Sequence, residues 1–379
     1  MVKSTAGGIY IHIPFCRRRC IYCDFYSVGS RLADWGKYVT ALLAEAESRL
    51  SRAAFKKPTI YIGGGTPSLI PPEEFIRLSE GVRKLAGEHG EFTVEVNPDD
   101  VTPELAKLWK EAGANRVSMG VQSMIDDELR AIGRRHDAYQ AEMAYDLLKS
   151  EFDNISLDVI FGLPGQTHSS LKKTIDGMLS MNPQHLSAYS LMYEERTALT
   201  RMRDNGMIYE QADEDVVGMF EYLSRRFEEA GYEQYEISNY ASPGFRSRHN
   251  SSYWSGLPYI GLGAAAHSYD GSRERRANVA DVRAYIAYWA NGMPQEPWNT
   301  ETLDETDLRE EMIMTRLRTK EGIDTQEFRS RFGMKEYESL LRHADEWIKS
   351  GYMELNDKGR LALSKSGIMI SDEIMASLF

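Results

Sequence analysis

The sequence predicts an α/β protein built from an open, partial (β/α)6 TIM-like barrel and a smaller C-terminal α+β domain. Strand-like runs alternate with amphipathic helical runs from residue 9 to about residue 230. Six such β-then-α units imply right-handed crossovers and a parallel sheet. They are fewer than the eight units that close a TIM barrel, so we expect the barrel to stay open. After residue 303 the pattern changes to helices followed by a hairpin.

Each unit combines a short strand-like run with a helical pattern. The strands are expected at 9–14, 59–63, 92–97, 116–122, 154–162 and 184–192. The helices are expected at 35–54, 72–85, 103–112, 137–150, 169–181 and 213–230. Thr102 and Pro103 are typical of a helix start, because a threonine N-cap is followed by proline at the first helical position.

Polar residues share one face of several expected strands. Glu95 lies on the face opposite Val94 and Val96, and Asp158 lies opposite Leu157, because successive side chains of a strand alternate. A closed barrel fills its interior with apolar side chains, and a buried carboxylate is costly unless it is paired. The pattern therefore favours a polar ligand inside a wide barrel. The alternative is a face that is merely hydrated.

Length and charge bound the classes of function. The chain has 379 residues, 42% of them hydrophobic, which suits a globular protein with one large and one smaller domain. Its net charge of −12 argues against nucleic acid as the main partner, because phosphate binding needs clustered cations. No apolar run reaches the length of a transmembrane segment, and residues 1–8 carry no apolar signal region. A cytoplasmic location is therefore expected.

All three cysteines of the chain fall within eight residues, at Cys16, Cys20 and Cys23. Their odd number and close C-x3-C-x2-C spacing indicate a metal or redox site rather than a set of disulfides. Three thiolates can hold three irons of a [4Fe–4S] cluster and leave the fourth iron open to an outside ligand. Two alternatives are reduced structural thiols and a zinc site with His12 as the fourth ligand.

A glycine-rich turn, Gly63-Gly64-Gly65-Thr66-Pro67, follows the second expected strand. Glycines let the backbone approach a ligand closely, although a lone glycine-rich turn is often only a tight connection. This turn lies on the same rim as the cysteines, at the carboxyl end of a strand, where α/β barrels build their sites. That position favours a binding turn.

The chain beyond the barrel contains a segment rich in tyrosine and small residues at 232–271 and an expected linker at 291–300. Residues 303–379 then give three helices, a hairpin at 352–364 and a final helix, an order that resembles a winged helix. Winged helices often bind DNA, but these residues hold 12 Lys and Arg against 16 Asp and Glu, a net of 12 − 16 = −4. We therefore expect a lid or docking domain.

Several motifs in order carry a resemblance to a known family: YIHIPFC, the cysteine motif continuing as DF, IGGGTPS, EVNP, SMGVQS, FGLPGQT and HNxxYW. The cysteine spacing, with an aromatic residue before the third cysteine, resembles the radical SAM superfamily. The full set resembles the family of HemN-type oxygen-independent coproporphyrinogen III oxidases and HemW-type heme chaperones. On this resemblance we expect a radical SAM barrel at 1–240, a connecting segment with HNxxYW at 241–295 and a winged-helix-like domain at 296–379.

The resemblance implies a [4Fe–4S] cluster on the three cysteines, with S-adenosylmethionine (SAM) chelated by the open iron. The reduced cluster would pass one electron to SAM, and a flavodoxin or ferredoxin would be the electron donor. The residues that match the family's SAM contacts are Tyr10 near the cluster, Tyr22 on the adenine, Gly64, Gly65 and Thr66 as backbone and hydroxyl contacts, Glu95 and Gln122 as acidic and polar contacts, Arg134 for the carboxylate and Asp158 for a hydroxyl.

Two features distinguish members within this family. The oxidases carry a fourth cysteine two positions after the third, where this chain has Phe25, which puts oxidase chemistry in doubt. HNxxYW is the signature of the HemW-type members, where it is associated with heme. Here it comprises His249, Asn250, Tyr253 and Trp254. An imidazole can ligate heme iron and aromatic rings can pack on a porphyrin, although a structural His–Asn pair beside two core aromatics is the alternative.

The resemblance therefore implies a heme chaperone that passes heme to a client protein. Arg246 and Arg248 could meet the heme propionates, and His267 is a second candidate ligand. Two alternative functions are kept. One is a coproporphyrinogen III oxidase, whose radical would remove hydrogen from a propionate side chain before carbon dioxide leaves. The other is a SAM-dependent enzyme that acts on another tetrapyrrole.

Overall fold

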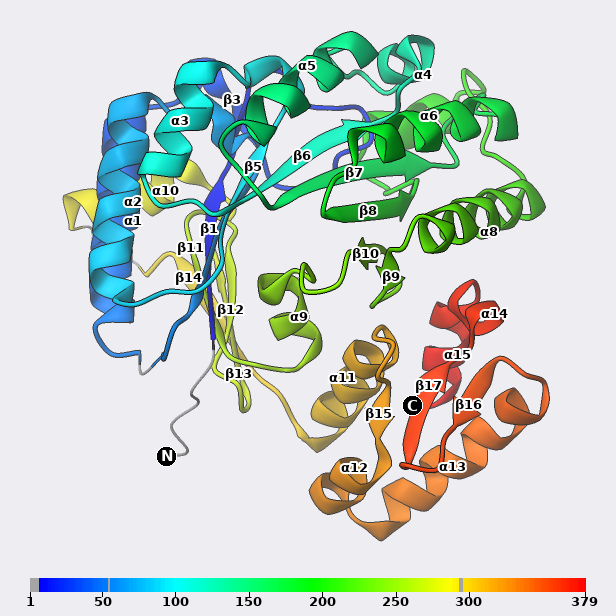
Figure 1. Cartoon of the computed structure of the whole chain (residues 1–379). Coiled ribbons are helices and arrows are strands. Elements are labelled where there is room, and N and C mark those ends of the chain that lie inside the picture. Colours follow the sequence, from blue (N-terminus) through cyan, green and yellow to red (C-terminus); the bar gives the residue numbers. More distant parts are fainter. Residues whose placement is uncertain (1–6, 54, 293–295) are drawn as a thin grey trace.

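The computed structural model describes residues 7–53, 55–292 and 296–379. A twisted sheet with helices on its outer face forms the larger part, and a bundle of helices and short strands forms the C-terminal part (Figure 1). In the described part of the chain, no helix has the length and apolar character needed to cross a membrane.

Six parallel strands form the centre of the sheet, in the order of the chain. They are β1 (Gly8–Ile13), β4 (Thr59–Gly64), β5 (Phe92–Val96), β6 (Arg116–Gln122), β7 (Ile155–Phe161) and β8 (His185–Ser190). The predicted partial barrel is confirmed. Each expected strand agrees with an observed strand to within two residues at either end.

The helices that connect these strands lie where the sequence pattern places them. They are α1 (Trp35–Leu50), α2 (Pro72–Ala86), α3 (Pro103–Glu111), α5 (Ala138–Lys149), α6 (His168–Met181) and α8 (Asp213–Glu229). Thr102 caps α3 by accepting a hydrogen bond from Leu105 N, as its sequence position predicts. The pattern does not predict the short helices α4 (Asp126–Ala131) and α7 (Ala198–Asp204), since one or two turns carry little periodicity.

The alternation of side chains along each strand separates an apolar core from a polar interior. Ile9, Ile11 and Ile13 of β1 are fully buried in the same apolar cluster as Leu42 of α1. The residues between them on β1 point into the barrel. The apolar core therefore lies between the strands and the helices, and the barrel interior is left for polar groups.

The sheet holds six further strands that the sequence pattern does not predict. They are β9 (Glu233–Gln234), β10 (Asn239–Ala241), β11 (Tyr259–Leu262), β12 (His267–Tyr269), β13 (Glu274–Asn278) and β14 (Trp298–Thr302). β10 and β9 extend the sheet beyond β8, while β11 pairs in parallel with β1 and β12 to β14 follow on that edge. The expected linker at 291–300 is wrong where β14 begins, and its residues 293–295 lie outside the described residues.

The segment 241–295 is therefore more than a connection. It supplies β11 to β13 and the helix α10 (Val282–Asn291), which packs against α1. Glu45 of α1 joins the two parts, because its buried carboxylate accepts hydrogen bonds from Asn278 of β13 and Tyr285 of α10. The expected domain boundaries near residues 240 and 296 stay predictions.

The C-terminal part follows the predicted winged-helix-like order, with a short strand between its first two helices. Its elements are α11 (Glu305–Leu317), β15 (Ile323–Asp324), α12 (Thr325–Phe332), α13 (Met334–Lys349), β16 (Met353–Leu355), β17 (Arg360–Leu363), α14 (Lys365–Ile368) and α15 (Ser371–Ser377). The three strands form a small sheet in the order β15-β17-β16. Phe328, Leu340 and Leu361 belong to an apolar core distinct from that of the barrel.

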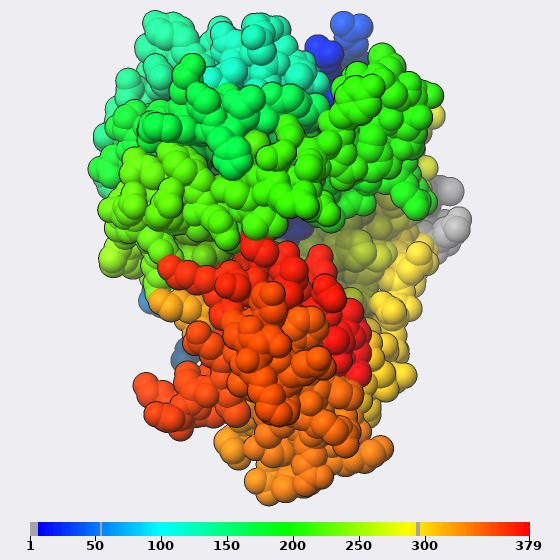
Figure 2. All heavy atoms as spheres, turned by 90° about the vertical axis from the view of Figure 1, so that its right-hand side faces the viewer, coloured from blue at the N-terminus to red at the C-terminus, as the bar shows by residue number. Residues whose placement is uncertain are grey.

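This C-terminal part docks on the barrel through the chain segment that follows α11. Lys320 N donates to Tyr235 O and Ile237 N donates to Arg318 O, each at 3.0 Å, which gives one antiparallel bridge beside β9. Lys365 also pairs with Glu228 of α8. Figure 2 shows the orange and red C-terminal part seated against the green segment of the barrel. The docking covers the end of the sheet, where unpaired backbone groups would otherwise be exposed.

Candidate functional site

The three cysteines line one cavity of about 450 Å³ at the carboxyl ends of the parallel strands. The short strand β2 (Phe15–Cys16) follows β1 and pairs with β3 (Val28–Gly29), and the loop between them carries Cys20 and Cys23. Cys16 is buried and the other two are half-buried. Burial raises the pKa of the thiols of Cys16 and Cys23. Metal binding at this loop would therefore release protons.

His12 distinguishes a cluster on the cysteine loop from a single zinc ion, which would need this histidine as its fourth ligand. A cubane cluster places each thiolate on a different iron, so it needs three separated sulfurs around one space. His12, the fourth ligand in the zinc alternative, has both ring nitrogens in hydrogen bonds, with the Tyr10 hydroxyl and with Tyr26 O, each at 3.0 Å.

The glycine turn is packed against the first cysteine. A Cβ atom at Gly65 would lie 2.9 Å from Cys16 Sγ and 2.8 Å from Ile13 O, so only glycine fits there. Gly64 has a φ of 111°, a conformation that side chains disfavour. Thr66 is buried and lines the same cavity. The turn therefore brings its backbone close to the cysteine site.

Two carboxylates reach the cavity from the barrel interior. Glu95 Oε2 accepts from Gly64 N at 3.0 Å, and Glu95 Oε1 accepts from the Tyr61 hydroxyl at 2.7 Å. Asp158 accepts from Ser118 Oγ at 3.4 Å. Burial raises the pKa of Glu95 to about 7 and that of Asp158 to about 6. Both carboxylates are therefore placed to gain from a cationic ligand in the cavity.

Gln122 is aimed into the cavity by a backbone irregularity. Its φ is 70°, and the pairing of β6 with β7 slips by one residue between Gly120 and Gln122. Such a bulge redirects a side chain and is common beside binding sites. Among the described residues nothing donates to the buried Gln122 Oε1. An unpaired buried acceptor of this kind fits a ligand donor.

Arg134 and Tyr22 complete the wall on the far side. Arg134 lies within hydrogen-bond distance of Cys20 Sγ (3.7 Å) and donates to Asn97 Oδ1 at 2.8 Å. Tyr22 lines the cavity beside them, and burial raises the pKa of its hydroxyl. Tyr10, expected near the cluster, lies deeper in the barrel against His12. Sequence reasoning did not single out Asn97 as a site residue, although it ends the strand expected at 92–97 and shares a face with Glu95.

The HNxxYW residues lie on a second element, the short helix α9 (Arg248–Trp254). His249 points into the barrel and is buried. Its Nδ1 is hydrogen-bonded to Thr59 Oγ1 at 2.7 Å and its Nε2 to the Tyr253 hydroxyl at 2.9 Å. Burial, with a smaller effect of the charge on Arg116, lowers the pKa of His249 to about 3. The imidazole is therefore neutral, and both nitrogens are engaged.

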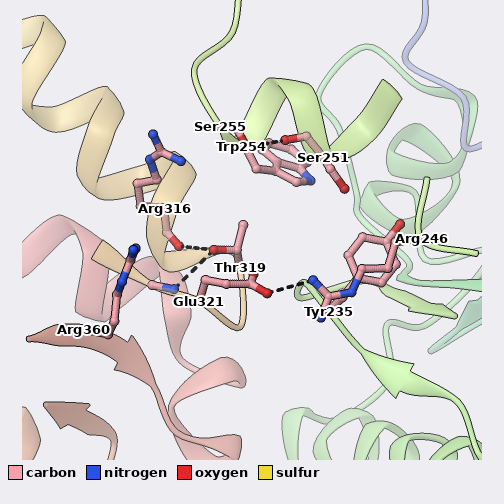
Figure 3. A pocket seen from close by; sticks show the side chains of 10 residues that line it. Tyr235, Arg246, Ser251, Trp254, Ser255, Arg316, Thr319, Glu321 and Arg360 are labelled. Atoms are coloured by element: carbon pink, nitrogen blue, oxygen red, sulfur yellow. Dashed lines mark hydrogen bonds and ion pairs between the residues drawn. The ribbon is translucent and has the colours of Figure 1, made fainter. Parts of the chain in front are cut away.

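Trp254 belongs to a different space, a cavity of about 300 Å³ between α9 and the C-terminal part (Figure 3). Arg318 stacks on its indole, 4.6 Å from the ring centroid. Arg246 lines the same cavity but is paired with Glu233 and Glu321. The expected heme residues are thus divided between two sides of α9. His249 faces the barrel, while Trp254 faces the C-terminal part.

Two further residues expected to contact heme lie apart from the cavity that Trp254 lines. Asn250 donates its backbone N–H to Ser247 Oγ, the cap of α9, and is half-buried. His267 lies on β12 and is exposed. The structure does not gather His267 with Trp254, and the heme contacts expected from the sequence stay predictions.

Comparison with known proteins agrees with this geometry. Residues 10–177 match the Radical SAM superfamily model and residues 303–370 match the HemN C-terminal domain model. The chain is 36% identical to the heme chaperone HemW of Bacillus subtilis, over 96% of this chain and 95% of that protein. It is 33% identical to the heme chaperone HemW of Escherichia coli, over 96% and 98%.

A solved structure supports the same assignment at the level of the fold. The coproporphyrinogen III oxidase HemN of Escherichia coli, a radical SAM enzyme, superposes with a TM-score of 0.84 at 19% identity. The match covers 99% of this chain and 90% of that one. The resemblance inferred from the sequence motifs is confirmed. The chain belongs to the HemW family within the radical SAM superfamily.

Proposed function

We propose that this chain binds a [4Fe–4S] cluster and SAM at the mouth of the barrel and carries heme to a client protein. One observation carries the proposal. Three cysteines, a glycine turn and two carboxylates meet at one cavity, in a chain whose HemW relatives match it over almost its full length. The cysteines would hold three irons and leave the fourth for SAM. Bound together, the cluster and SAM supply one-electron chemistry.

The residues around the cavity have distinct parts in this proposal. Arg134 is placed to bind the carboxylate of SAM, since a guanidinium forms charge-assisted hydrogen bonds with it. Glu95 and Asp158 attract the cationic amino group and accept hydroxyl donors, and the bound cation would lower the pKa values that burial raises. Gln122 Oε1 gains a donor, and Gly64, Gly65 and Thr66 form the turn over the ligand. Tyr22 packs against the adenine, and Tyr10 supports the wall from below.

Heme is assigned to α9, with His249 as the iron ligand. Because Trp254 faces the other side of this helix, its packing on the same porphyrin requires α9 to rearrange. His249 Nε2 is hydrogen-bonded to the Tyr253 hydroxyl, so iron ligation by that nitrogen requires this hydrogen bond to break. Asn250 and Arg248 lie on the same short helix and would contact the periphery of the ligand. The C-terminal part, expected to act as a lid or docking domain, faces Trp254.

Heme titration of cluster-free protein tests this assignment. His249→Ala is expected to abolish stable binding, while His267→Ala binds as wild type does. Tyr253→Phe keeps the ring but removes the competing hydroxyl, so heme binding should tighten about fivefold, the equivalent of one hydrogen bond of about 1 kcal/mol. The Soret absorbance measures all four proteins. If both histidine variants bind heme as tightly as wild type does, α9 is not the heme site.

The second candidate function, oxygen-independent coproporphyrinogen III oxidase, is disfavoured by one residue. Phe25 stands where the oxidases carry their fourth cysteine, and its side chain is 68% exposed at the rim of the cavity. We expect reconstituted protein with SAM and a reductant to form no protoporphyrinogen IX from coproporphyrinogen III. Chromatography of the anaerobic reaction measures the product. Steady formation of protoporphyrinogen IX would show that the chain acts as an oxidase and would overturn the chaperone assignment.

The proposed partners follow from the same chemistry. A heme-accepting client protein receives the cargo, and a flavodoxin or ferredoxin reduces the cluster. A cytoplasmic location belongs to the proposal as well. A SAM-dependent activity on another tetrapyrrole is the remaining alternative, and conversion of added heme to a modified porphyrin by cluster-loaded protein with SAM and a reductant would favour it.

A further inference from the structure

The two sites assigned above are joined by one side chain. Tyr61 lies on β4, in the polar interior of the barrel, and is buried. Its hydroxyl donates to Glu95 Oε1 at 2.7 Å. Its ring stacks on the imidazole of His249, with 4.9 Å between the ring centroids and 27° between the planes. Tyr61 therefore contacts the barrel-mouth site with its hydroxyl and α9 with its ring.

The packing around Tyr61 allows little independent movement. A Cβ atom at Gly63 would lie 2.8 Å from the Tyr61 ring and 3.0 Å from the Glu95 carboxylate. A Cβ atom at Gly8 would lie 3.1 Å from the His249 ring. Both positions are glycine, so neighbouring strands close tightly over the three side chains. In a close-packed interior, displacement of one group is passed to the groups it touches.

The Glu95 end of this link is directed at the cavity. Its second oxygen accepts from Gly64 N in the turn that covers Cys16. A cation in the cavity attracts the Glu95 carboxylate and favours its ionised form. The Tyr61 hydroxyl bonded to that carboxylate must then follow it or lose its acceptor.

The His249 end of the link is directed at α9. Strand β4 holds the imidazole twice, through the Tyr61 ring and through Thr59 Oγ1. The other ring nitrogen is bonded to Tyr253, one turn later in the helix. Trp254 follows directly and faces the cavity against Arg318, and α9 contacts α11. A shift of the imidazole therefore changes the hydrogen bond that competes with iron ligation.

We propose that Tyr61 couples the two sites, so that SAM bound beside Glu95 changes the affinity of α9 for heme, and heme changes the affinity for SAM by the same factor. The inference rests on the proposed function for the identity of both ligands. Tyr61 is a positioning residue here, because it acts through Glu95 and His249. Reciprocity is required of any such linkage between two binding equilibria.

The test compares heme dissociation constants of cluster-loaded protein with and without saturating SAM. In wild type we expect SAM to change the constant at least about fivefold, the lower range of allosteric coupling. Tyr61→Phe keeps the ring stack but removes the hydroxyl, so each ligand should still bind and the SAM effect should fall below about twofold. Tyr145→Phe is the matched control, since its buried hydroxyl donates to Asn182 O on the outer layer. It should retain the full effect.

A second measurement needs no heme. Hydrogen exchange of the α9 amides is followed in cluster-loaded protein as SAM is added. The backbone amides of Arg248 and His249 donate to the Glu91 carboxylate, so their exchange rates report whether the start of α9 keeps this contact. SAM should alter their exchange in wild type and in Tyr145→Phe, and leave it unchanged in Tyr61→Phe.

The outcomes separate this inference from the proposed function. Absence of heme binding by wild type would remove the proposed function, while the exchange measurement would still test the coupling. Wild-type protein that binds both ligands independently, with unchanged α9 exchange, would overturn the coupling alone. A SAM effect of equal size in wild type and Tyr61→Phe would assign the coupling to another route and also overturn it.

Discussion

Cys20→Ser protein is expected to contain no [4Fe–4S] cluster after anaerobic reconstitution. Cys16, Cys20 and Cys23 are the only cysteines of the chain, so no other thiolate can take the vacant position. A serine oxygen is a poor substitute, because soft thiolate ligands select iron–sulfur clusters. The loss should be complete rather than partial, since two thiolates leave two irons of the cubane without a protein ligand. The broad visible absorption and the iron content per chain measure the result.

The matched control for this substitution lies just outside the cysteine loop. Arg31→Ala changes an exposed residue eight positions after Cys23 and should reconstitute as wild type does. Cys20→Ser also removes the contact between Arg134 and Cys20 Sγ, so the fold of this variant has to be measured separately from its cluster content. Far-ultraviolet circular dichroism reports the fold. An unchanged spectrum and iron content in Cys20→Ser would remove the cluster assignment from these cysteines.

The parts of the fold that local patterns encode could be predicted from the sequence. The sequence predicts a strand at 116–122, and β6 is observed at Arg116–Gln122, because the alternation of polar and apolar residues there is regular. The same regularity places Glu95 and Asp158 on the interior face, since side-chain direction in a strand has a period of two. The cysteine spacing similarly concentrates the three thiols at one rim, whatever the details of the loop.

The parts that depend on distant partners could not be predicted. β12 and β13 are short and polar, and their pairing with each other, with β11 and with β14 makes them strands. The HNxxYW motif gives no sign that His249 turns inward, because its partner Thr59 is 190 residues away. The bulge that aims Gln122 at the cavity likewise depends on pairing with β7. Burial and pairing of this kind override local propensity.

Glu45→Ala should destabilise the fold by about 3–5 kcal/mol, the cost of removing one partner from a buried charged network. Glu45 is fully buried on α1. Its carboxylate accepts from Gly263 N at 3.0 Å, from Asn278 Nδ2 at 3.0 Å and from the Tyr285 hydroxyl at 2.6 Å. It also pairs with Arg49 and Arg276. Alanine would leave these donors and both guanidinium groups without their shared acceptor.

The loss of stability in Glu45→Ala should be largest in the strands and helix that the Glu45 carboxylate joins to the barrel. Urea unfolding of cluster-free protein measures the loss of stability, and hydrogen exchange should show lost protection in β11, β13 and α10 before the rest of the sheet. Glu47→Ala is the matched control, an exposed glutamate two residues further along α1, and should change stability by less than about 0.5 kcal/mol. Equal effects of the two substitutions would mean that Glu45 does not hold the edge of the sheet, and that β11 to β13 are retained by backbone pairing and by the packing of α10 on α1.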